Sequence, residues 1–154
     1  MSLYALRLAP GSTLLEDAET VSESRDGWAF LWEAVTLWRL VNPAHAEAIE
    51  RFVSQVADAN EPCTQFAGGD LATLIEMLKG LEEAIRAAGI IDEDGRVAPE
   101  RLEELKRQVP AMDVASERSQ ENRRYALLEV ILHAQFLRMF LSKAYSAGCI
   151  VVHD

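Results

Sequence analysis

The chain has 154 residues, a net charge of -10 and a hydrophobic fraction of 49%. This length and composition are typical of a single globular domain, which we expect to span residues 1–154. Strictly apolar runs are short, and a membrane span needs about 20 consecutive apolar residues, so we expect no bilayer-crossing helix. The negative charge disfavours binding to nucleic acid or to an anionic membrane surface.

The excess of negative charge is unevenly distributed along the chain. Residues 1–111 contain 20 Asp and Glu against 10 Lys and Arg, whereas residues 112–154 contain five of each kind. An acidic surface of this sort suits a basic protein partner, and it also keeps a protein soluble without any partner. The charge pattern therefore leaves both interpretations open.

The first elements are predicted as a strand followed by a helix. Residues 3–8 are rich in Leu and Tyr and end at Pro10-Gly11, as in a short strand. The acidic stretch 12–26 contains at most one helical turn, over residues 14–18. From Gly27 the spacing of the apolar residues is helical, and we expect all of them in the core: Trp28, Leu31, Trp32, Val35 and Trp38.

Three further helices are predicted before the last one. Asn42 is placed to cap a helix over residues 44–59 with Pro43 in its first turn, and Asp70 to cap a helix over residues 71–88 that Gly89 ends. A short amphipathic helix is expected over residues 98–109.

The end of the chain decides the predicted architecture. Residues 124–147 form a long, almost wholly apolar helical pattern, which we expect to be buried on nearly every side. Gly148 and an apolar strand over residues 149–153 follow it. Since a strand needs a hydrogen-bonding partner, the two terminal strands should pair. The prediction is a mainly α, α+β fold, with about five helices and a small sheet formed by the N- and C-terminal strands.

The sequence lacks a recognisable catalytic or metal-binding motif. His45, His133 and His153 are far apart, and Cys63 and Cys149 are separated by 86 positions. We expect two free thiols in a reducing cytoplasm, with a disulfide as the alternative. We therefore predict no metal, no cofactor and no enzymatic activity.

One polar set within the last helix is the alternative candidate site. Glu129 and His133 are four residues apart and can touch, and Arg138 lies across the helix. These three side chains would line a pocket of a small enzyme or ligand-binding protein. The competing interpretation is a core histidine that a carboxylate holds in place.

Two segments resemble the YfbM-like family, a bacterial domain of unknown function. The ending FLRMFLSKAYSAGCIVVHD is similar to the closing helix and strand of that family, and SRDGWAFLWEAV is similar to its Asp- and Trp-containing helix start. This chain begins Met-Ser-Leu where the family has Met-Gly-Met. The resemblance covers about 30 residues and implies a sheet that joins the termini on a helical body. It transfers no catalytic residue, and it points slightly towards immunity partners of bacterial toxins.

These observations favour a small, acidic, cytoplasmic binding protein that neutralises a basic protein partner, as an immunity-type inhibitor of a bacterial toxin does. Acidic side chains would steer the association, and a few apolar anchors would hold the complex. The candidate partner-binding residues lie in the segment 12–26 and in the turn 92–95: Glu16, Asp17, Glu19, Glu23, Asp26, Asp92, Glu93 and Asp94.

Overall fold

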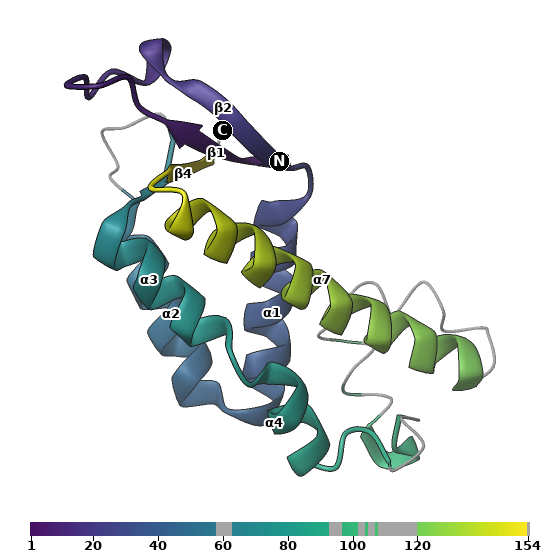
Figure 1. Ribbon diagram of the computed structural model, residues 1–154. Helices are drawn as coiled ribbons and strands as arrows, with labels where there is room; N and C mark the ends of the chain where they lie inside the picture. Colours follow the sequence, from purple (N-terminus) through teal and green to yellow (C-terminus); the bar gives the residue numbers. More distant parts are fainter. Residues whose placement is uncertain (58–62, 93–96, 102–103, 105–106, 108–119, 154) are drawn as a thin grey trace.

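The computed structural model describes residues 1–57, 63–92, 97–101, 104, 107 and 120–153. Over these residues the chain forms β1 (Leu3–Arg7), the 3-10 turn η1 (Leu15–Asp17), β2 (Glu19–Ser24), α1 (Gly27–Val41), α2 (Pro43–Val56), β3 (Gln65–Phe66), α3 (Gly68–Leu78), α4 (Leu81–Ala87), the 3-10 turn η2 (Pro99–Arg101), α7 (Gln120–Ser146) and β4 (Ile150–His153). A small sheet caps one end of a helical body (Figure 1). The predicted α+β fold class is confirmed.

The sheet is antiparallel and has the strand order β2-β1-β4-β3. The predicted pairing of the terminal strands is confirmed, because Ala5 of β1 lies opposite Val151 of β4. Phe66 of β3 pairs with Val151 from the other side, and these three side chains are all at most 1% exposed. The sequence analysis missed β2 and β3. β3 has two residues, and β2 is exposed at nearly every position, so neither strand has a hydrophobic pattern.

The helix α7 packs along the helical body, but it is not buried on every side. It packs against α1 and α3, and Leu127, Val130, Leu137 and Leu141 are nearly inaccessible to solvent. On its outer face, however, Leu132, Phe136 and Met139 are 45%, 54% and 51% exposed. The expectation of burial on nearly every side is therefore wrong for this face, which lies uncovered across the front of Figure 1.

The other helix predictions are partly confirmed. Asn42 caps α2, since its Oδ1 accepts a hydrogen bond from the backbone N–H of His45 at 3.2 Å. Asp70 does not cap α3, which begins two residues earlier at Gly68. The helix predicted over residues 71–88 is divided into α3 and α4, because Gly80 adopts φ = 78° and turns the chain. Beyond η2, most of the helix predicted over residues 98–109 lies outside the described residues.

The start of α1 is packed tightly against the sheet. Gly27 is buried, and a Cβ atom built on it would lie 2.8 Å from Ser24 Oγ and 2.9 Å from Leu3 Cδ1. A residue larger than glycine would require the side chains of Ser24 and Leu3 to move. This contact fixes the direction in which α1 leaves the sheet.

Both cysteines are free, as expected, and Cys149 is buried at 4% exposure. Within the described part of the chain, no helix is both long and apolar enough to cross a membrane.

Candidate functional site

Five of the predicted partner-binding residues lie on the edge strand β2 or just before and after it. We call Glu16, Asp17, Glu19, Glu23 and Asp26 the acidic edge. They belong to η1, to β2 and to the residue before α1, and all five are exposed. Because β2 is the outermost strand, these carboxylates surround a strand that solvent reaches from both faces. These residues are thus spread along the length of β2, with Glu16 and Asp17 before the strand and Asp26 after it.

Two members of the acidic edge have local partners. Glu19 forms an ion pair with Arg7 of β1 at 3.6 Å, with both side chains more than half exposed. Glu23 Oε1 accepts a hydrogen bond from Ser2 Oγ at 2.8 Å. The exposed ion pair between Arg7 and Glu19 contributes little to stability, whereas the hydrogen bond between Ser2 and Glu23 is partly buried. Glu16, Asp17 and Asp26 have no side-chain partner among the described residues, and Asp26 does not use its carboxylate to cap α1.

The second predicted acidic segment does not join this edge. Asp92 is exposed and follows α4, which lies at the opposite end of the helical body from β2 (Figure 1). Glu93 and Asp94 lie outside the described residues. The chain therefore does not present Asp92 and the acidic edge to a partner on one surface.

The residues of the predicted set Glu129, His133 and Arg138 contact different parts of the helical body. His133 Nδ1 donates a hydrogen bond to Glu33 Oε2 of α1 at 2.9 Å, since a carboxylate only accepts. The ring of His133 stacks on Phe30 with a centroid distance of 4.2 Å, and Glu129 lies 3.7 Å away with 70% of its side chain exposed. His133 thus links α7 to α1, which supports the interpretation of a histidine held by a carboxylate.

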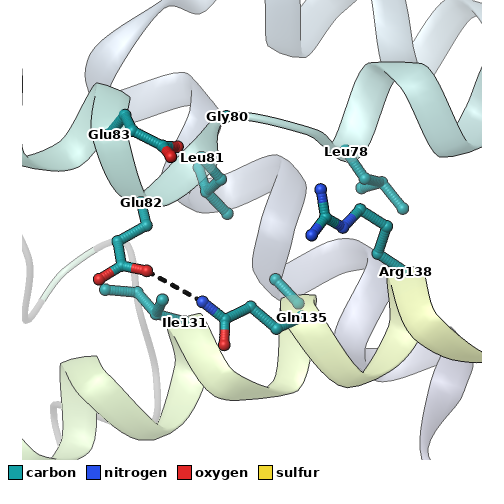
Figure 2. Close-up of a pocket in the computed structure, with 9 residues that line it drawn as sticks. Leu78, Gly80, Leu81, Glu82, Glu83, Ile131, Gln135 and Arg138 are labelled. Atoms are coloured by element: carbon teal, nitrogen blue, oxygen red, sulfur yellow. Dashed lines mark hydrogen bonds between the residues drawn. The ribbon is translucent and has the colours of Figure 1, made fainter.

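Arg138 faces a different part of the body, and it lines a cavity of about 70 Å³ between α7 and the turn that joins α3 to α4. Figure 2 shows its guanidinium directed towards Leu78 and Gly80, while Gln135 donates to Glu82 at 2.9 Å. Glu82 also forms an ion pair with Arg86 at 3.3 Å. The sequence analysis missed Glu82 because the turn at Gly80, which brings α4 against α7, has no signature in the helical periodicity.

The tryptophans differ in exposure. Trp38 is 7% exposed and belongs to the core as predicted. Trp28 is partly buried and stacks on His153 with a centroid distance of 3.9 Å. Trp32 packs edge-on against Trp28 but is 36% exposed, so its placement in the core was wrong. An exposed Trp is a residue type that often anchors protein interfaces.

Over the described residues, no group of three or more His, Cys, Asp and Glu side chains is placed to hold a metal ion. Comparison with known proteins gives no match, whether to a protein-family model, to a curated protein or to a solved structure. The resemblance to the YfbM-like family accordingly stays a prediction.

Proposed function

We propose that this chain is a small acidic binding protein that acts in the cytoplasm and neutralises a basic protein partner, as an immunity-type inhibitor of a bacterial toxin does. The observation that carries the proposal is the acidic edge. Five exposed carboxylates lie along the edge strand β2 and just beyond its two ends, and three of them have no side-chain partner among the described residues. Carboxylates in this condition are available to a cationic surface.

The physical role of the acidic edge is to attract the partner before contact. A group of like charges raises the rate of association with an oppositely charged protein. This increase in rate becomes smaller as the salt concentration rises, because ions screen the charges. The side chains of β2 project on both faces, so a basic active site that closes over the edge would be occupied by carboxylates. The neutral residues Thr20, Val21 and Ser22 lie between them on the strand.

The test is capture of the partner. The purified chain, immobilised by a tag, is incubated with a lysate of the organism that encodes it, and retained proteins are eluted with increasing salt and identified. The proposal predicts one basic protein that elutes as salt rises and whose toxic activity the chain suppresses in cells. Retention of nothing, or retention that salt does not change, would contradict it.

A second candidate function is supported by the cavity beside Arg138. Its volume corresponds to between two and about five water molecules, which suits a small polar ligand rather than a drug-sized one, and Glu82 and Glu83 line it together with Arg138. The guanidinium of Arg138 has no ion-pair partner among the described residues and would bind an anionic group of such a ligand. Calorimetric titration with acetate and with phosphate, on the wild type and on Arg138→Gln, tests this candidate. Heats that the substitution abolishes would support it, and an absence of heat would contradict it.

A further inference from the structure

The outer face of α7 carries an apolar stripe with a charge at each end. We call Glu129, Leu132, Phe136, Met139 and Lys143 the α7 stripe. Its three apolar side chains are 45–54% exposed, and Lys143 is exposed as well. A contiguous exposed apolar stripe on one helix face is a candidate surface for contact with another protein.

The spacing of the α7 stripe is that of a coiled coil. Its residues follow one another at intervals of three, four, three and four, which are the intervals between the a and d positions of a heptad. A stripe with these intervals lies along one side of a helix and packs against a second helix in a shallow crossing. In Figure 1, α7 lies in front of the helices on which it packs, and none of the described helices or strands lies in front of it.

The charges at the two ends specify the partner. Glu129 and Lys143 each lie seven residues from Phe136, on opposite sides of it. When two copies of the stripe pair in antiparallel fashion about Phe136, Glu129 of each copy meets Lys143 of the other. In a parallel pairing, Glu129 would face Glu129 of the other copy and Lys143 would face Lys143, so charges of the same sign would repel. The stripe is therefore complementary to itself in one orientation only.

The remainder of the charge distribution permits this pairing. The excess negative charge lies in residues 1–111, while residues 112–154 carry five acidic and five basic side chains. Lys143 has no ion-pair partner among the described residues, and Glu129 has only the long contact with His133 at 3.7 Å. Both charges are thus available to a second copy.

We propose that two copies of this chain associate through the α7 stripe as an antiparallel, two-fold symmetric dimer. Phe136 of each copy lies at the centre, flanked by Leu132 and Met139, and two intermolecular ion pairs close the ends. Standard interfaces bury about 800 Å² per partner, and three half-exposed side chains supply less, so the dimer is weak. This inference does not rest on the proposed function.

Analytical ultracentrifugation of the wild type, from about 10 µM to about 1 mM, measures the association at concentrations suited to a weak interface. The proposal predicts a concentration-dependent monomer–dimer equilibrium. Phe136→Glu should weaken it about tenfold or more, because it places two carboxylates at the centre of the interface. The matched control is Leu14→Glu, which changes a residue of similar exposure, 53%, outside α7 and should leave the equilibrium unchanged. A wild type that stays monomeric, or a dimer that Phe136→Glu does not weaken, would overturn the proposal.

A charge exchange tests the antiparallel orientation. Glu129→Lys and Lys143→Glu, each alone, should weaken the dimer, because each sets like charges together at both ends. The double variant Glu129→Lys/Lys143→Glu should restore the wild-type association, since the exchanged charges meet again in the antiparallel arrangement. Circular dichroism of each variant establishes that the fold is unchanged, as expected for two exposed positions. A double variant no tighter than the singles would rule out this pairing.

Discussion

His133 in the middle of α7 donates a hydrogen bond to Glu33 of α1 across 2.9 Å, although the two residues are 100 positions apart. The contact lies where α7 crosses α1, and each side chain is about one-quarter exposed. Phe30 of α1 covers the imidazole face. His133, which the sequence suggested as a residue lining a pocket, therefore connects α7 to α1 through its hydrogen bond to Glu33.

We predict that Glu33→Ala destabilises the protein by about 1 kcal/mol, because it removes a hydrogen bond to a charged acceptor that solvent partly reaches. The control is Glu129→Ala, which removes only the contact at 3.7 Å and should change stability by less than about 0.5 kcal/mol. Urea denaturation measures both. Equal losses for the two variants would contradict the role given to Glu33.

The two faces of α7 should respond differently to truncation. Leu137 is inaccessible to solvent, so Leu137→Ala should cost about 2–5 kcal/mol through lost burial and the cavity that it leaves. Leu132 on the outer face is 45% exposed, and Leu132→Ala should cost less than about 0.5 kcal/mol in the monomer. Urea denaturation in dilute solution compares them. Similar costs at the two positions would show that the outer face is covered.

Gly27 gives a third prediction. Gly27→Ala should destabilise the protein by about 1–3 kcal/mol, because its methyl group would lie within 3.0 Å of Ser24 and Leu3. Gly69→Ala is the matched control in a helix, since a Cβ there meets nothing within 4 Å, and it should be neutral or stabilising by up to about 1 kcal/mol. Thermal unfolding followed by circular dichroism measures the pair. A Gly27→Ala variant as stable as the wild type would contradict the packing described for α1.

The terminal strands could be predicted from the sequence because both are short and rich in apolar residues, and a strand requires a hydrogen-bonding partner. β2 could not, because its own residues Glu19, Thr20 and Glu23 are polar, and the strand forms by pairing with β1. The division of α3 from α4 was also missed, since apolar spacing continues through the φ = 78° turn at Gly80.

The same reasoning explains the candidate site. The acidic residues of the segment 12–26 could be predicted as a group because they are close in sequence. The sequence alone could not predict whether these acidic residues lie near Asp92, or whether His133 lies near Arg138, because both depend on how the helices pack together. On α7, those two side chains reach towards α1 and towards α4 respectively.

A fourth prediction concerns the two thiols. Cys63 is partly exposed and Cys149 is buried, so a thiol reagent should modify Cys63 in the folded protein and Cys149 only when the protein unfolds. Titration of the native and the urea-denatured protein with an aromatic disulfide reagent counts them. Absence of both thiols before reduction would indicate a disulfide and contradict the structure.

The most direct measurement for the acidic edge is the association rate with the captured basic partner, compared between two variants of equal charge. The first, Glu16→Gln/Asp17→Asn/Asp26→Asn, neutralises the edge, and the second, Glu47→Gln/Glu83→Gln/Glu100→Gln, neutralises three exposed carboxylates of the helical body and η2. We predict about a tenfold slower association for the first variant, a loss that high salt removes, and little change for the second. Equal rates for the two variants would contradict a role for the acidic edge in binding.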